Sequence, residues 1–141
     1  MIDGVIKTKL KVISLDEGDV MHGMRSDDVG FLGFGEAYFS TVYAGCVKGW
    51  KRHRQMTCNF IVPNGQIKIV IFDEKTSAFM ETVLSPENYL RLTIPPMVWV
   101  AFQGIDRDLS LLLNIASIKH DPTEADTKEI NAIKYDWSAN R

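Results

Sequence analysis

The sequence predicts an all-β fold, a sandwich or barrel formed by one domain over residues 1–141. Short runs rich in β-branched and aromatic residues recur along the chain, about nine or ten in all, at the spacing typical of such folds. The Asn64-Gly65 pair between two of these runs predicts a tight hairpin, because both central positions of a type I′ turn need positive φ. Only residues 122–132 could hold a helix, so we expect a short helical or irregular C-terminal tail.

The expected strands follow one another with turns and loops between them. They span residues 5–13, 36–44, 46–54, 57–63, 66–73, 77–84, 89–94, 98–103 and 109–117. The first strand alternates apolar residues with lysines, the period of a strand with one buried face. Ser85-Pro86 and Pro95-Pro96 separate later strands, since proline cannot donate to a strand ladder. The loop at residues 30–35 (GFLGFG) is expected to be a flexible flap, because its glycines neither follow a strand nor open a helix.

Composition excludes several classes of protein. Hydrophobic residues make up 45% and charged residues 24%, which disfavours disorder. No apolar run approaches the roughly 20 residues that a membrane span needs. The alternating N-terminal run is expected to be a strand and not a signal peptide. Cys46 and Cys58 are therefore expected to be free thiols of a cytoplasmic protein. A net charge of -2 argues against a general nucleic-acid binder.

The expected strand at residues 46–54 is the most basic part of the chain and predicts a site for a small anionic ligand. Its cationic and potentially cationic residues are Lys48, Lys51, Arg52, His53 and Arg54. Alternation places Lys51 and His53 on one face and the other three on the opposite face, unless a bulge at Gly49 shifts the register. The alternative is that this strand is a solvated edge of the sheet.

The stretch from residue 45 to residue 65 resembles the first motif of the cupin family. The motif positions are occupied here by Gly45, Lys51, His53, Cys58 and Gly65. The second motif resembles Pro95-Pro96-Met97, followed by Val100 where the last metal ligand would be a histidine. Because only His53 remains of four ligand positions, we expect no metal or other cofactor, and a metal-dependent dioxygenase or isomerase is disfavoured.

A closer resemblance covers nearly the whole chain. Residues 34–53, 94–102, 114–122 and 133–137 are similar to short members of the dTDP-4-dehydrorhamnose 3,5-epimerase family. The resemblance implies a metal-free cupin-like jelly-roll barrel, usually a homodimer, that acts on nucleotide-linked 4-keto-6-deoxy sugars. It makes the fold assignment specific, whereas the catalytic positions depart from the family pattern.

The resemblance also implies roles for individual residues. The histidine that abstracts the proton beside the ketone corresponds to Lys51, and the tyrosine that returns a proton corresponds to Asn114. A basic residue that contacts the phosphates corresponds to Lys48, and a second lysine aligns near Cys58. The carboxylate that orients the family's histidine would lie beyond residue 141.

From these residues we expect Lys51 and His53 to act as base and partner, because burial and like charges lower the pKa of a lysine and histidine titrates near neutrality. Lys48, Arg52 and Arg54 are expected to hold the diphosphate, since the planar guanidinium donates two parallel hydrogen bonds to a phosphate.

Five further polar side chains are candidates for substrate contacts. Tyr38 and Tyr43 lie on opposite faces of one strand, so at most one faces the interior, where it could replace the missing proton donor or simply pack. Cys58 could be a thiolate near so many cations, although no His and Asp accompany it. Asn59 and Asn114 are polar residues in apolar strands, where an unbonded polar group is costly. Either they contact hydroxyl groups of a sugar, or they form hydrogen bonds between a strand and a loop.

These observations predict a metal-independent epimerase or isomerase of a nucleotide-linked 4-keto-deoxysugar in cell-surface polysaccharide biosynthesis. The alternative is a catalytically silent sugar-nucleotide-binding module that kept the barrel and lost the acid and base. If the chain is an enzyme, inversion at a single centre or ketoisomerisation is expected, because a double epimerisation needs an acid on the second face.

Overall fold

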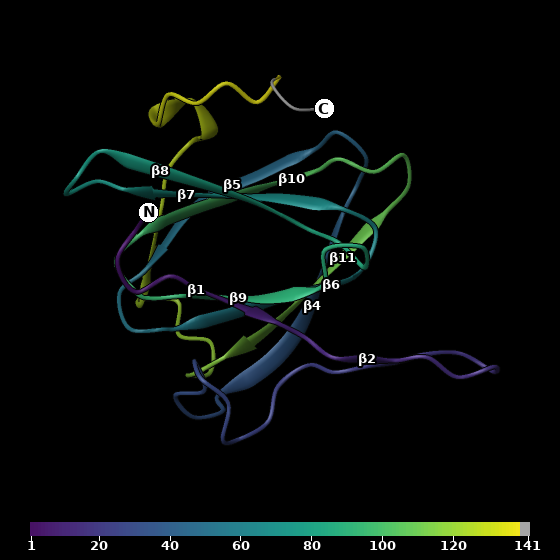
Figure 1. Cartoon of the computed structure of the whole chain (residues 1–141). Helices are drawn as coiled ribbons and strands as arrows, with labels where there is room; N and C mark the ends of the chain where they lie inside the picture. The colour runs from purple at the N-terminus through teal and green to yellow at the C-terminus, as the bar shows by residue number, and fades with distance from the viewer. Residues whose placement is uncertain (139–141) are drawn as a thin grey trace.

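The computed structural model describes residues 1–138 and consists of two five-stranded antiparallel sheets that face each other (Figure 1). The first sheet has the order β1 (Ile6–Lys9), β9 (Leu90–Ile94), β6 (Cys58–Asn64), β11 (Ser110–Ala116) and β4 (Glu36–Val42). The second has the order β12 (Ala125–Thr127), β5 (Val47–His53), β10 (Trp99–Gly104), β7 (Ile67–Asp73) and β8 (Ala78–Leu84). Because strands that follow one another in sequence cross between the sheets, the fold is a jelly roll, and the all-β prediction is confirmed.

Smaller elements lie outside the two sheets. A hairpin of β2 (Val12–Ile13) and β3 (Val20–Met21) projects from the body (Figure 1), and a 3-10 turn, η1 (Ile130–Ala132), follows β12. The expected first strand is therefore divided into β1 and β2. Residues 122–132 do not form the α-helix that was considered for them. Instead β12 adds an edge strand to the second sheet, and the 3-10 turn η1 follows it. Among the described residues no helix is long and apolar enough to cross a membrane.

The hairpin predicted at Asn64-Gly65 is also wrong. β6 pairs with β9 and β11, whereas β7 pairs with β8 and β10, so the turn passes from one sheet to the other. Gly65 has φ of 84°, but Asn64 is not among the positive-φ residues, so the type I′ requirement is not met. A Cβ on Gly65 would lie 2.2 Å from Ser110 Oγ, so glycine is needed here for close approach to β11.

The main hydrophobic core fills the space between the sheets. Ile67, Ile69 and Ile71 of β7 alternate toward it and pack with residues such as Leu92 of β9. A second cluster covers the outer face of the second sheet, where Trp50 and its neighbours pack beneath the C-terminal segment. The indole Nε1 of Trp50 donates to the carbonyl of Ile130 at 3.1 Å, which ties β5 to that segment.

β5 contains the bulge on which the sequence prediction was conditional. Val100 pairs with Lys51 and Phe102 pairs with Lys48, so two residues of β5 lie opposite one residue of β10. Gly49 has φ of 150°, and a Cβ there would lie 2.4 Å from the Cβ of Ala101. The extra residue moves Lys48 to the same side of the sheet as Lys51 and His53.

Candidate active site

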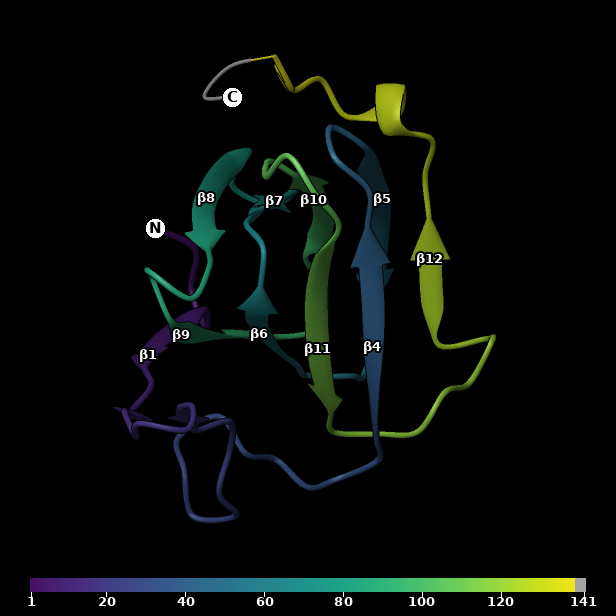
Figure 2. The ribbon, with the colours of Figure 1, turned by 90° about the vertical axis from the view of Figure 1, so that its right-hand side faces the viewer.

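A pocket of about 390 Å³ opens between the sheets, where β4 and β5 face each other. Figure 2 looks onto this side of the molecule, with β11 and β4 of the first sheet beside β5 and β12 of the second. The polar residues that line the pocket are Tyr38, Ser40, Lys48, Lys51, His53, Cys58, Thr127 and Lys128, of which Lys128 directs its ammonium away from the pocket, to Glu74. Apolar side chains including Phe60, Phe102 and Leu112 form the remaining wall, so the polar groups are set in a largely apolar surface.

His53 is fixed by a carboxylate that lies behind it. Its Nδ1 is 2.7 Å from Oε1 of Glu124, and the side chains are 15% and 4% exposed. The other oxygen of Glu124 accepts the backbone N–H groups of Gln55 (2.9 Å) and Met56 (3.0 Å). Burial raises the pKa of Glu124, but the hydrogen bonds from His53 and these amides outweigh it and lower the pKa to about 2. Because an ionised carboxylate can only accept a hydrogen bond, Glu124 favours the His53 tautomer that carries its proton on Nδ1 and has Nε2 as the acceptor.

Tyr38 reaches the pocket from the opposite sheet and is held by Asn114. The Nδ2 of Asn114 donates to the Tyr38 hydroxyl at 3.0 Å, and its Oδ1 accepts the backbone N–H of Asn59 at 3.1 Å. Because the hydroxyl oxygen accepts from Asn114, its own proton is free for a ligand. Burial raises the pKa of Tyr38, so the phenol stays protonated. Asn114, expected at the acid position itself, is fully buried and reaches the pocket only through its hydrogen bond to Tyr38.

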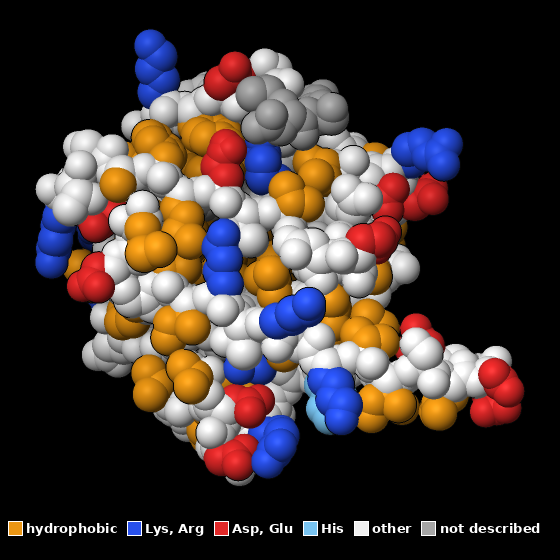
Figure 3. All heavy atoms as spheres, viewed as in Figure 1, with side chains coloured by type: hydrophobic (Ala, Val, Ile, Leu, Met, Phe, Trp, Pro, Cys, Tyr) orange, Lys and Arg blue, Asp and Glu red, His pale blue; other side chains and the backbone are white. Residues whose placement is uncertain are grey.

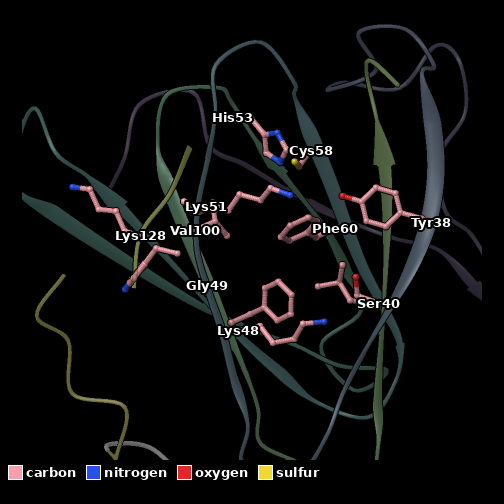
Figure 4. Close-up of a pocket in the computed structure, with 14 residues that line it drawn as sticks. Tyr38, Ser40, Lys48, Gly49, Lys51, His53, Cys58, Phe60, Val100 and Lys128 are labelled. Atoms are coloured by element: carbon pink, nitrogen blue, oxygen red, sulfur yellow. The ribbon is translucent and has the colours of Figure 1, made fainter. Parts of the chain in front are cut away.

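Two lysines bring positive charge to the same pocket. Figure 4 shows the Lys51 side chain extending between His53 and Phe60 toward Tyr38, and Lys48 lying lower in the pocket. Among the described residues, none forms an ion pair or hydrogen bond with the Lys51 ammonium. The Lys48 ammonium lies 3.3 Å from the carbonyl of Thr41 and 5.7 Å from the ring centre of Phe102.

Cys58 lines the pocket as a neutral thiol. It is 4% exposed, and burial raises its pKa to about 12, although a hydrogen bond with Asn114 and the charge of Lys51 act in the opposite direction. This agrees with the sequence-based expectation that a nucleophilic Cys58 is disfavoured, because removal from water outweighs the effect of the nearby cations. The thiol can contact a ligand but is a poor nucleophile.

Arg52 and Arg54 do not line the pocket, contrary to their expected place at a diphosphate. Arg52 pairs with Asp126 at 2.9 Å and stacks on Trp99, with its guanidinium 4.8 Å from the ring centre. Arg54 pairs with the same carboxylate at 2.5 Å and donates to the carbonyl of Thr123. These arginines anchor the C-terminal segment on the outer side of β5.

Two other candidates also lie outside the pocket. Tyr43 follows β4 and is 69% exposed. Asn59 is buried, and its side chain donates to the carbonyl of Gly30 at 3.0 Å and accepts from Thr93 Oγ1 at 2.6 Å. Of the two roles left open for Asn59, the structure shows the strand-to-loop hydrogen bond.

Glu124 is the functional candidate that sequence reasoning missed. It lies 71 positions after His53, in a segment expected to be helical or irregular. One signal could have indicated it: Asp121, Glu124 and Asp126 place negative charges in the tail that complement the most basic strand. Among the residues that the structure describes, no group of three or more His, Cys, Asp or Glu could hold a metal ion.

Together, fold and pocket define a cupin-like jelly roll that brings titratable side chains and lysine ammonium groups together in one pocket. The chain belongs to the family described as FdtA: WxcM-like, C-terminal, which matches residues 6–134. The resemblance to dTDP-4-dehydrorhamnose 3,5-epimerases holds for the fold, which a Sulfolobus tokodaii member shares at 21% identity and a TM-score of 0.82, over 96% of this chain and 82% of that one.

Three other proteins are more similar in sequence than the Sulfolobus tokodaii protein. A probable low-salt glycan biosynthesis epimerase of Haloferax volcanii is 30% identical over 113 residues, which are 73% of this chain and 72% of the relative. The crystal structure of a dTDP sugar isomerase from Desulfovibrio desulfuricans is 34% identical, covers 99% of this chain and 94% of its own, and has a TM-score of 0.94. The sugar 3,4-ketoisomerase QdtA of Thermoanaerobacterium thermosaccharolyticum shares the fold, at 23% identity and a TM-score of 0.78 over 89% of each chain.

Proposed function

We infer that this protein is an isomerase or epimerase of a dTDP-linked keto-sugar in glycan biosynthesis. The family and the activities named for the Desulfovibrio and Haloferax relatives support this inference. The observation that carries the mechanism is the placement of His53 and Tyr38, which reach one pocket from opposite sheets with the Lys51 side chain between them (Figure 4).

We propose that His53 removes the proton from the carbon beside the ketone. Its Nε2 is the free acceptor, and the imidazolium that forms is stabilised by the ionised Glu124 at 2.7 Å. Lys51 was expected to be the base, but its ammonium is better suited to stabilising the enolate oxygen, since a cation near developing negative charge lowers the barrier. The electron pair of the broken C–H bond forms the C=C bond of the enolate, the π pair of the carbonyl moves to the ketone oxygen, and the proton resides on His53.

Tyr38 is the proposed proton donor on the opposite side. Protonation of the enolate carbon by its hydroxyl reforms the ketone with inverted configuration and leaves a tyrosinate. Proton exchange with solvent then returns Tyr38 and His53 to their starting states. The hydrogen bond from Asn114 favours this step, because an amide donor stabilises the phenolate oxygen that forms.

Lys48 is the proposed contact for a phosphate of the nucleotide. It lies in the same pocket as Lys51, whereas Arg52 and Arg54 are paired with Asp126. Phe102 beside Lys48 provides an apolar surface against which the ligand can pack.

One base and one acid can invert a single carbon. A second candidate is 3,4-ketoisomerisation, because a single acid–base pair is also sufficient to move the ketone to the adjacent carbon. Incubation with TDP-4-keto-6-deoxyglucose, the ligand in a QdtA crystal structure, followed by NMR of the product, distinguishes these reactions. A product inverted at both C3 and C5 would contradict the proposal of one acid–base pair.

A further inference from the structure

A second cavity, of about 250 Å³, lies on the other side of the first sheet, away from the candidate active site. It is bounded by the end of β1 and by the loop that follows β3. Its charged and titratable side chains are Lys9, Lys11, His22, Arg25, Asp28 and Arg91. Four of these carry a positive charge and one a negative charge, in a chain whose net charge is -2. Figure 3 shows Lys and Arg side chains beside a histidine at the base of the projecting hairpin.

Arg91 is the unusual member of this group. Its side chain is 0% exposed, and its nearest carboxylate, that of Asp28, is 3.4 Å away. The guanidinium also donates to the carbonyls of Gly23 (2.7 Å) and Val29 (3.1 Å), but its Nε–H has no partner among the described residues. The Asp28 carboxylate is shared, since it accepts the backbone N–H of Arg25 at 2.8 Å.

The single carboxylate among the described residues that pairs with this fully buried guanidinium, at 3.4 Å, is shared with the backbone of Arg25, so the charge of Arg91 is only partly compensated. An orphaned N–H in the interior adds a further cost. A small oxyanion would compensate the charge of the guanidinium and accept a hydrogen bond from Nε–H, because it brings negative charge and several acceptor atoms. Lys9 and Lys11 are exposed, and neither has an ion-pair partner within residues 1–138, so both are available to such a ligand.

We propose that this cavity binds a small oxyanion, a phosphate group that is either free or carried by a larger molecule. The site is separate from the proposed active site, so its test does not depend on catalysis. Titration of the full chain with inorganic phosphate at constant ionic strength, followed by NMR of arginine Nε–H and backbone amide signals, examines Arg91 directly. A saturable shift of the Arg91 Nε–H signal and of amides in residues 22–28 is expected.

The Lys9→Ala/Lys11→Ala variant tests the location, since both side chains are exposed and their removal leaves the core intact. It should weaken phosphate binding by at least about tenfold. The matched control is Lys7→Ala/Lys119→Ala, which removes the same charge from exposed positions that do not line the cavity and should bind as the parent protein does.

The same titration is repeated with dTDP to distinguish a free phosphate from a phosphate carried by a nucleotide. It uses the Lys48→Ala/Lys51→Ala variant, because this variant lacks the two lysines proposed to bind the ligand in the active site. A shift of the Arg91 signal with either ligand supports the site. The proposal would be overturned if neither ligand gave a saturable shift. It would also be overturned if Lys9→Ala/Lys11→Ala and its control Lys7→Ala/Lys119→Ala weakened phosphate binding equally, and Arg91 would then only anchor the loop.

Discussion

His53 Nδ1 lies 2.7 Å from Glu124 Oε1, which joins the strand that carries the candidate base to the residue before β12. The pair is reinforced by the ladder between β5 and β12, in which His53 lies opposite Ala125. The C-terminal segment therefore contributes to the acid–base site although it does not supply the base itself.

Replacement of Glu124 by glutamine should lower kcat by about 10²-fold with a smaller effect on KM, because the neutral amide no longer stabilises the imidazolium. Steady-state kinetics measure this. The matched control is Glu129→Gln, the same change at an exposed position in the same segment, which should leave kcat unchanged. Equal kcat values for the two variants would contradict the role of Glu124.

Acid should destabilise the fold through Glu124. Its pKa is about 2 in the folded protein, below the ordinary value of 4.5, so its contribution is fully present above about pH 4.5 and is lost as the pH falls toward 2. The contribution is on the order of 3 kcal/mol. Urea unfolding at several pH values measures it, and the free energy of unfolding of Glu124→Gln should fall less between pH 5 and 3 than that of the parent, by about 2 kcal/mol.

Tyr38→Phe should separate proton removal from inversion. His53 can still exchange the substrate proton with solvent, but no donor is available on the opposite side, so deuterium should enter the substrate without inversion. NMR of the recovered sugar in D₂O measures both events. Tyr43→Phe, which removes an exposed hydroxyl outside the pocket, should behave like the parent; inversion at the parental rate by Tyr38→Phe would exclude Tyr38 as the donor.

Lys48→Ala should weaken dTDP binding by about tenfold, since it removes a cation from the pocket. Arg54→Ala should not change dTDP affinity, and it should cost at most about 1 kcal/mol of stability as a partly exposed ion pair. Calorimetric titration with dTDP tests both variants. Loss of affinity in Arg54→Ala instead would restore the arginine to the phosphate site.

The two cysteines should react at different rates. Cys46 is exposed, whereas Cys58 is buried and its pKa is raised to about 12, so iodoacetamide at pH 8 should modify Cys46 first. Mass spectrometry of peptides measures the order, with urea-unfolded protein as the control in which both react. Rapid modification of Cys58 in the folded chain would contradict its neutral, buried state.

Most strands could be predicted because alternation and turn residues are local signals. The partners of each strand could not, since the turn at Asn64-Gly65 has the same composition whether it closes a hairpin or crosses between sheets. Gly65 is required by the approach of Ser110, which is distant in sequence. The 122–132 segment was misjudged because its pairing with β5 overrides its weak local preference.

The candidate site was predictable to the extent that one strand carries it. Lys51 and His53 share a face by alternation, and the bulge at Gly49 adds Lys48 to that face. The groups that orient the site were not predictable, because Glu124 and the Tyr38–Asn114 hydrogen bond are tertiary contacts over 71 and 76 positions. Because of those contacts, the proposed base is His53 in place of Lys51, and the proposed acid is Tyr38 in place of Asn114.

The most direct test of the proposed reaction is solvent exchange catalysed by the parent protein and by His53→Asn. TDP-4-keto-6-deoxyglucose is incubated with each in D₂O, and deuterium on the carbons beside the ketone is measured by NMR, with dTDP binding by both proteins established first. Incorporation by the parent and its loss in His53→Asn are predicted. A parent that binds the ligand but incorporates no deuterium would contradict the account and identify a sugar-nucleotide-binding module, and exchange at the parental rate by His53→Asn would exclude His53 as the base.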